Sequence, residues 1–110
     1  MHGGVDAVFS ALADERRRSL VEVLAERGSA TATELAAGLP VTRQAVAKHL
    51  ASLGEAGLVA VTRSGREARY RLTPEPLDDA VAWIERVGAS WDERLAALER
   101  HLAEGRGSDA

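Results

Sequence analysis

The chain has 110 residues, a length that fits one domain with one modest core. Hydrophobic residues make up 45% and charged residues 28%, values that exclude an intrinsically disordered chain. No stretch approaches the roughly 18 apolar residues of a membrane span, and the N-terminus has no basic region, so we expect no signal peptide. Cysteine is absent, which excludes disulfides, thiolate metal sites and a cysteine nucleophile and is compatible with the expected cytoplasmic location.

Charge is distributed unevenly around a net value of −3. Residues 1–41 carry −2 (four arginines, six acids), residues 42–73 carry +4 (six basic residues, two acids) and residues 74–104 carry −5 (three arginines, eight acids). Because screening limits electrostatic reach to about 8 Å at physiological salt, a phosphate backbone would respond to the local charge. The basic centre is a candidate for contact with nucleic acid, and a plain solvated surface explains it equally well.

Two helices are predicted at the N-terminus. Apolar residues recur at i, i+3, i+4 and i+7 from Val5 to Leu12, which predicts the first helix. Asp14 is a candidate N-cap for the second, whose apolar stripe extends to Leu24 and which Gly28 would end.

A helix-turn-helix is predicted over about residues 31–56. Thr31 and Glu34 have the spacing of a capping box, in which each side chain satisfies a free backbone amide at the start of a short helix. Thr42 is the next N-cap candidate, only a few residues after that helix ends. Two helices joined by so short a turn indicate this motif.

The second helix of this motif, over about 43–56, has two distinct faces. At 100° per residue its apolar face consists of Val46, Leu50 and Leu53. The opposite face consists of Gln44, Lys48, Ala51 and Glu55. We therefore expect this helix to be held by its apolar side with Gln44 and Lys48 in solvent.

A β-hairpin is predicted over 58–72, with Ser64–Gly65 as its two-residue loop. In that register Val59 lies opposite Tyr70, and apolar and charged side chains separate onto the two faces.

A long helix is predicted over about 77–103, before a flexible tail over 105–110; residues 1–104 would form one domain. Its apolar positions step alternately by four and three, the heptad spacing of a coiled-coil seam. They are Leu77, Val81, Ile84, Gly88, Trp91, Leu95, Leu98 and Leu102. Glycine within a helix costs about 1 kcal/mol relative to alanine, so either a partner backbone approaches Gly88 or the helix bends there.

This order of elements is that of a winged helix-turn-helix, a mainly α fold with a two-stranded β-wing. The residues also resemble the ArsR family of bacterial repressors over about residues 5–73. The matching segments are 11–18 (ALADERRR), 34–36 (ELA) with 45–50 (AVAKHL), 53–59 (LGEAGLV) and 63–72 (RSGREARYRL). The resemblance implies a DNA-binding transcriptional regulator that acts as a homodimeric repressor.

The resemblance also bears on metal sensing. Metal-sensing relatives use paired cysteines in the helix that here spans 34–39, or acid and histidine clusters in the last helix, where this chain has only His101. Since a sensor site needs at least two ligands in fixed geometry, we predict no metal site. Residues 89–95 (ASWDERL) resemble the metal-independent branch of the family.

Candidate DNA-binding residues come from the recognition helix and the wing, because recognition helices place their N-terminal residues over base edges. They are Thr42, Arg43, Gln44, Ala47, Lys48 and His49, with Arg63, Ser64, Gly65, Arg66 and Arg69 of the wing. Gln44 can pair bidentately with adenine, and Lys48 or Arg43 with guanine. Phosphate contact or solvation is an equal alternative for Arg43, and a structural role or a phosphate contact is the preferred interpretation of His49. The family usually has serine or threonine where Ala47 stands.

A module this small buries little surface on DNA, so a homodimer on inverted-repeat half-sites is expected. The predicted dimer-interface residues are Val5, Val8, Phe9, Val81, Ile84, Gly88, Trp91, Leu95 and Leu98. Trp83 and Trp91 could instead line a ligand pocket, and whether an effector exists stays open.

Two other classes of function remain. A protein–protein interaction module on the same scaffold would dock through the long helix, which the acidic flanks and the tryptophan pair favour. An enzyme has little support, since the chain has no glycine-rich phosphate loop and none of His2, His49 and His101 lies near a serine nucleophile motif. We expect no catalytic residue, no cofactor and no membrane partner.

Overall fold

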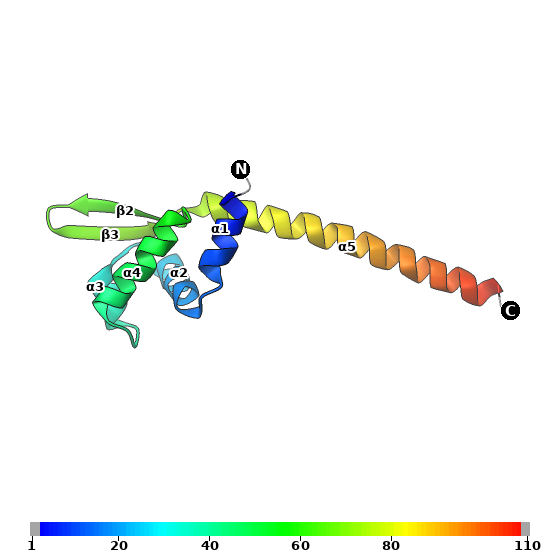
Figure 1. The fold of residues 1–110 in the computed structure, drawn as a ribbon, viewed down its shortest axis with the longest axis horizontal. Coiled ribbons are helices and arrows are strands. Elements are labelled where there is room, and N and C mark those ends of the chain that lie inside the picture. Colours follow the sequence, from blue (N-terminus) through cyan, green and yellow to red (C-terminus); the bar gives the residue numbers. More distant parts are fainter. Residues whose placement is uncertain (1–2, 109–110) are drawn as a thin grey trace. The chain divides into compact units, whose positions relative to one another are not determined.

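The computed structural model describes residues 3–108 and the side chains of residues 4–105. The elements in chain order are α1 (Gly3–Leu12), α2 (Glu15–Arg27), β1 (Ala30–Thr31), α3 (Ala32–Ala37), α4 (Arg43–Glu55), β2 (Val59–Ser64), β3 (Glu67–Leu72) and α5 (Pro74–Ser108) (Figure 1). The predicted fold class is confirmed: the chain is mainly helical, with a β-hairpin wing and a long last helix. It divides after Ala80 into two compact units, called here the N-terminal unit and the C-terminal unit.

The predicted N-caps are confirmed at three helix starts. The backbone N–H of Arg16 donates to Asp14 Oδ1 at 2.8 Å, and that of Ala45 donates to Thr42 Oγ1 at 3.1 Å. At the start of α3, Thr31 and Glu34 form both bonds of the capping box. Each cap satisfies amides that have no partner within the helix, which fixes where these helices begin.

Side chains of the arginine run at the start of α2 cap the C-terminal end of α1. Arg17 Nε donates to the carbonyl of Ala11 at 2.7 Å, and Arg18 Nη1 donates to that of Leu12 at 2.6 Å. The last carbonyls of a helix lack amide partners and carry partial negative charge, so cations stabilise this position. A basic run that is unfavourable for its own helix is therefore favourable for the preceding one.

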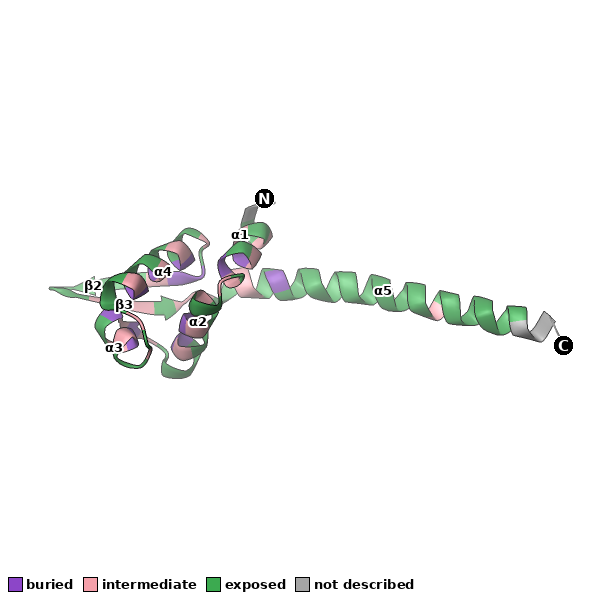
Figure 2. Ribbon diagram, turned by 60° about the horizontal axis from the view of Figure 1, so that its bottom comes forward, coloured by how far each residue is buried: buried purple, intermediate pink, exposed green. Residues whose placement is uncertain are grey.

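The core of the N-terminal unit is formed by the apolar stripes of α1 to α4 and the start of β2. Its largest fully buried side chains are Leu20, Leu24, Leu35, Leu50, Leu53, Leu58, Val8 and Val46. Figure 2 shows these buried stretches on the inner sides of the helices. Val8, predicted at a dimer interface, is 0% exposed inside this core, so it has no free surface to offer a partner.

The wing belongs to a three-stranded antiparallel sheet with the order β1-β3-β2. The third strand, β1, is not part of the sequence prediction. Ala30 pairs with Tyr70 and Thr31 with Arg69, which ties the start of α3 to the wing. A two-residue strand has too short a pattern to be recognised, because it depends on a partner about 40 residues away.

The hairpin register differs from the predicted one by two residues. Ser64 pairs with Glu67, so the loop is Gly65–Arg66 and the predicted loop Ser64–Gly65 is wrong. Gly65 has φ 61°, and a type II′ turn requires a positive φ at its first central position. In the described chain no residue other than glycine has a positive φ. Because side chains alternate with period two, this shift leaves every residue on its predicted face.

The last helix is longer than predicted at both ends. It begins at Pro74, because the first amides of a helix have no partner and proline there loses no hydrogen bond. It extends through Ser108, so residues 105–108 of the expected tail are helical, and residues 109–110 lie outside the described residues. No helix in the described part of the chain combines the length and the apolar character needed to cross a membrane.

Candidate nucleic-acid interface

The recognition helix α4 presents its polar face to solvent, as predicted. Val46, Leu50 and Leu53 are at most 1% exposed, whereas Gln44 and Lys48 are exposed. The helix is therefore held rigidly by its own core while the two polar side chains extend outward. That arrangement allows side chains to reach base edges without movement of the backbone.

A groove of about 420 Å³ lies between the first turns of α4 and the wing. Arg43, Gln44 and Ala47 line it from α4, and Arg63 and Arg66 line it from the wing. Residues that lie about 20 positions apart in the sequence thus share one concave surface. The acidic side chain of Glu67 is exposed and lines the same groove. We use the name α4–wing surface for nine other exposed residues of this region: Thr42, Arg43, Gln44, Ala47, Lys48, Arg63, Ser64, Gly65 and Arg66.

Thr33 and Tyr70, which were not candidate site residues in the sequence analysis, also line this groove. Arg43 Nε donates to Thr33 Oγ1 at 3.0 Å, so α3 holds the Arg43 guanidinium at the groove wall. Tyr70, half-buried on β3, also lines the groove. Neither carries a local sequence signal, because both contacts join elements that are distant along the chain.

The tip of the wing concentrates positive charge. Arg63 and Arg66 flank Gly65, and all three are exposed. Among the side chains that the structure describes, no ion pair involves either arginine. Their charges are therefore available to phosphates, in keeping with a wing that positions a protein on a nucleic-acid backbone.

Arg69, the remaining wing candidate, lies in a different environment from the tip. Its Nη2 is 3.2 Å from Glu34 Oε1, its Nη1 is 2.9 Å from Glu67 Oε1, and its Nε donates to Ser29 Oγ at 3.2 Å. It lies on the face of β3 opposite to that of Tyr70 and ties the wing to the start of α3. Two carboxylates therefore compensate its charge within the chain.

Known proteins resemble this chain over most of its length. A family model described as a helix-turn-helix domain matches residues 12–62. The HTH-type transcriptional regulator YuzN of Bacillus subtilis is 41% identical over 92 residues, which cover 77% of this chain and 100% of the relative. The arsenical resistance operon repressor of Escherichia coli is 32% identical over 96 residues, 87% of this chain and 82% of the relative.

A solved structure shares both sequence and fold. The ArsR-like transcriptional regulator from Rhodococcus sp. RHA1 is 43% identical, with a TM-score of 0.78 over 90% of this chain and 92% of the other. The chain belongs to the ArsR family. As a member of that family it is a DNA-binding transcriptional regulator, and the α4–wing surface is the region where its helix-turn-helix and wing meet.

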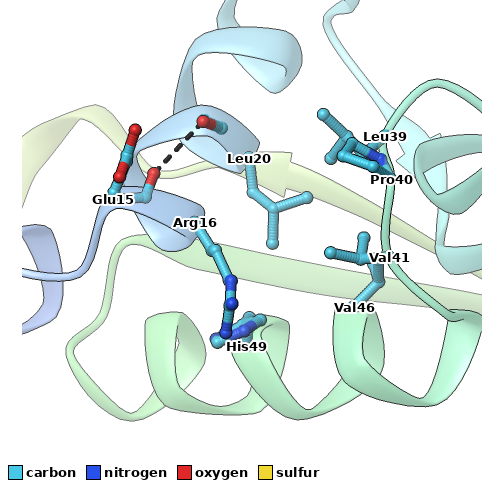
Figure 3. Close-up of a pocket in the computed structure, with 9 residues that line it drawn as sticks. Glu15, Arg16, Leu20, Leu39, Pro40, Val41, Val46 and His49 are labelled. Carbon is cyan, nitrogen blue, oxygen red and sulfur yellow. Dashed lines mark hydrogen bonds between the residues drawn. The ribbon is translucent and has the colours of Figure 1, made fainter.

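His49 lies on the flank of α4 away from the wing in this ArsR-family chain. It is half-buried and lines a cavity of about 340 Å³ with Arg16 of α2 and the apolar side chains of Leu20 and Val46. Figure 3 shows the Arg16 side chain extending from α2 toward His49, with the apolar side chains of Leu20 and Val46 to one side. The structure therefore does not bring His49 together with the side chains of the groove.

Glu34 connects three elements of the ArsR fold. Its carboxylate accepts the backbone N–H of Thr31 at 2.8 Å and pairs with Arg27 at 3.4 Å and with Arg69 at 3.2 Å. The Thr31 amide bond, helped by the two guanidinium groups, lowers the pKa of the Glu34 carboxyl below its ordinary value. The start of α3 is thereby fixed to the end of α2 and to β3.

The pKa of the Asp14 carboxyl is also lowered, chiefly because it accepts the backbone N–H of Arg17, with smaller contributions from the backbone N–H of Arg16 and the charge of the Arg17 guanidinium. Within the described residues of this ArsR-family chain, no group of three or more His, Cys, Asp or Glu side chains lies close enough to hold a metal ion.

The C-terminal unit exposes the seam that was predicted as a dimer interface. Val81, Ile84, Trp91, Leu95 and Leu98 are all exposed. Val5 and Phe9 of α1, also predicted for the interface, are half-buried in the N-terminal unit. A shallow depression that includes Trp83 and Trp91 is lined by residues of α5 alone, so it is a surface feature of one helix and not an enclosed pocket within this chain.

Proposed function

We propose that this chain is a homodimeric repressor that reads an inverted-repeat operator through the major groove with α4. The observation that carries the proposal is the outward position of Gln44 and Lys48 on a helix whose other face is locked in the core. A helix about 10–12 Å wide fits the major groove of B-DNA, which is about 12 Å wide.

The proposal assigns different roles to the two parts of the α4–wing surface. Gln44 and Lys48 would contact base edges, since an amide can pair with adenine and an ammonium can donate to guanine O6 and N7. Arg63 and Arg66 would hold phosphates and fix the register of the protein on the duplex, as would Thr42 and Ser64. The local charge of +4 over residues 42–73 supports such a contact in a chain that is acidic overall.

Dimerisation would place two copies of α4 on successive turns of the duplex, roughly 34–36 Å apart. Two half-sites also supply the buried surface that one small module lacks. The exposed apolar seam of α5 supports a dimer, and the Escherichia coli relative is named as a repressor.

The proposal includes regulation without a metal-sensing site, in the bacterial cytoplasm where chromosomal DNA is bound. The chain has no cysteine, and His101 is the single histidine of α5. Two or more ligands in fixed geometry are the minimum for a sensor site. No catalytic residue or cofactor is part of the proposal.

The experiment that tests this proposal selects bound sequences from a genomic DNA library with the purified full-length protein. We expect enrichment of an inverted repeat and a gel shift that weakens steeply as salt rises, because several phosphates are neutralised per dimer. Gln44→Ala should erode the preference for the selected repeat over random DNA. A flat selection at low salt, with no shift of any duplex, would overturn the proposal, and release of the operator by added zinc would overturn its metal-independent part.

A further inference from the structure

The groove between α4 and the wing has basic side chains on both walls. Arg43 lines it from the first turn of α4, and Arg63 and Arg66 line it from the wing. Among the side chains that the structure describes, none of these three arginines belongs to an ion pair. The acidic lining residue, Glu67, is paired instead with Arg69, whose Nη1 lies 2.9 Å from Glu67 Oε1. The groove therefore offers positive charge to a ligand.

Arg43 lies on a different side of α4 from the two base-reading candidates. Gln44 and Lys48 lie opposite the apolar face, whereas Arg43 precedes Gln44 and is turned from it by about 100° around the helix, toward the wing. A helix is about 10–12 Å wide and the major groove about 12 Å wide, so a helix seated there has a phosphate backbone along each flank. A side chain on the flank of α4 is therefore expected to contact the backbone, while the outward face contacts base edges.

A hydrogen bond from α3 fixes the Arg43 side chain on this flank. Arg43 Nε donates to Thr33 Oγ1 at 3.0 Å, and both residues are exposed and line the groove. A guanidinium has five N–H donors, so the bond at Nε leaves the donors of Nη1 and Nη2, which can pair with two phosphate oxygens. The bond also orders a long side chain before a ligand arrives, and such ordering otherwise costs affinity.

The wing supplies the opposite wall of the groove. Arg63 lies two residues along β2 from Val61, which pairs with Tyr70 of β3. Residues two positions apart share one face of a strand, so Arg63 lies on the same face of the wing as Tyr70, and both line the groove. Arg43 and Arg63 thus border one concave surface from two sides.

We propose that this groove holds one segment of the DNA backbone between Arg43 and Arg63, and that Thr33 is a positioning residue that fixes Arg43 for the contact. The inference rests on the repressor function proposed above and adds a path for one strand, along the flank of α4 beside the wing. It assigns Arg43 to phosphate and not to guanine. The groove volume of about 420 Å³ lies within the range of roughly 300–1,000 Å³ that ligand sites span, which leaves room for a phosphodiester unit.

Substitution of Arg43 tests whether this side chain contacts phosphate or base. In fluorescence anisotropy with the full-length protein, Arg43→Ala should weaken binding to the selected repeat and to scrambled duplexes by the same factor, about tenfold, as expected for one charge-assisted hydrogen bond. The slope of log affinity against log salt should fall by about 1 for each copy in contact with DNA. A loss of preference at one base pair, with unchanged binding to scrambled DNA, would overturn the assignment to phosphate.

Substitution of Thr33 tests the positioning role. Thr33→Val removes the acceptor and should weaken binding to every duplex roughly 3- to 10-fold, the range of one hydrogen bond. Thr33→Ser keeps the hydroxyl and should retain most of the affinity. In the Arg43→Ala background, Thr33→Val should cost nothing further, because its effect passes through Arg43. An equal loss in the two backgrounds would overturn the positioning role.

Thr62→Val is the matched control for Thr33→Val. Thr62 Oγ1 also accepts a guanidinium hydrogen bond, from Arg71 Nη1 at 2.9 Å, but Thr62 lies on the face of the wing opposite to that of Tyr70. Both threonines are exposed, so both variants should keep the stability of the wild type within about 0.5 kcal/mol. Thr62→Val should leave DNA binding unchanged, and a loss equal to that of Thr33→Val would overturn the inference.

Uncharged backbone substitutions locate the strand. In half-site duplexes, one phosphate at a time is replaced by a neutral methylphosphonate. One position should weaken the wild type and have no effect on Arg43→Ala. The position found in the same way with Arg63→Ala should be the same phosphate or its direct neighbour, because both arginines line one groove. Positions two or more phosphates apart would overturn the shared contact.

The outcomes separate this inference from the function on which it rests. A wild-type protein that binds no duplex would overturn the repressor function and this inference with it. A wild-type protein that binds its selected repeat, while Thr33→Val behaves as Thr62→Val does, would overturn the inference alone.

Discussion

The two amphipathic helices α4 and α5 differ in whether their apolar face is buried within the chain. In α4 the apolar side chains Val46, Leu50 and Leu53 are buried in the N-terminal unit, and polar side chains are left outside. In α5, beyond Ala80, the apolar seam is exposed together with the polar side chains around it. In each helix the exposed face indicates the kind of partner. In α4 it is a polar surface beside a polar groove, and in α5 it is an apolar stripe that a second apolar stripe could cover.

The largest expected effect separates the two apolar faces by the same substitution. Leu50→Ala removes a core side chain that is 1% exposed and should lower the free energy of unfolding by about 2–5 kcal/mol. Leu98→Ala, at 52% exposure, should change unfolding of the N-terminal unit by less than about 0.5 kcal/mol and should act on dimerisation instead. Urea titrations followed by circular dichroism at a fixed protein concentration measure the free energy of unfolding of both variants. Equal losses for the two variants would break the comparison.

The polar face of α4 should show the reverse behaviour. Lys48→Ala should cost about 1–3 kcal/mol of operator binding, because one ammonium that donates to a guanine is lost. The free energy of unfolding should stay within about 0.5 kcal/mol of wild type, since Lys48 is exposed. Fluorescence anisotropy with operator and scrambled duplexes gives the first quantity and thermal melting the second. A variant that loses stability and keeps operator preference would contradict the assignment.

The two kinds of wing arginine sharpen the comparison further. Arg66→Ala should weaken binding to every duplex alike and reduce the slope of log affinity against log salt by about 1 for each copy in contact with DNA. Arg69→Ala should act chiefly on stability, because Arg69 bridges Glu34 and Glu67 within the chain. Arg100→Ala on α5 is a matched control for loss of one exposed positive charge. The prediction for Arg66 fails if its salt slope equals that of the control.

The smallest expected effect concerns acid stability. The folded-state pKa of Glu34 is lowered, so its contribution to stability is present at neutral pH and is lost as the pH falls through and below its ordinary range. Glu34→Gln should therefore flatten the acid side of the stability profile, measured as urea midpoints from pH 7 down to pH 3. Glu22→Gln, on the exposed side of α2, removes one carboxylate outside this cluster and serves as the control. An unchanged acid profile in Glu34→Gln would contradict the role of this carboxylate.

Features with a local cause could be predicted from the sequence. The caps at Asp14, Thr31 and Thr42 depend on residues within three positions, and helical periodicity assigned the faces of α4 correctly. The faces of the hairpin were predicted as well, although its register was not. A side-chain alternation of period two cannot distinguish registers that differ by two residues, and only the requirement of Gly65 for positive φ at the first loop position decides between them.

Features that depend on distant contacts could not be predicted in the same way. The pairing of Ala30 with Tyr70 and the bond from Arg43 to Thr33 need the fold before they exist. Arg69 has the same residue type as Arg66 and also lies in the wing, and its contacts with Glu34, Glu67 and Ser29 distinguish its environment from that of Arg66. The candidate surface could therefore be located from sequence, while the state of each charge within it required the structure.

The composition of the α4–wing surface also offers a practical route to following its occupancy. Lys48 is the single lysine of the chain and its side chain is exposed. Apart from the α-amino group, an amine-reactive reagent therefore has one target. Mass spectrometry of acylated protein can report, molecule by molecule, how much of the population had that ammonium shielded at the moment of labelling.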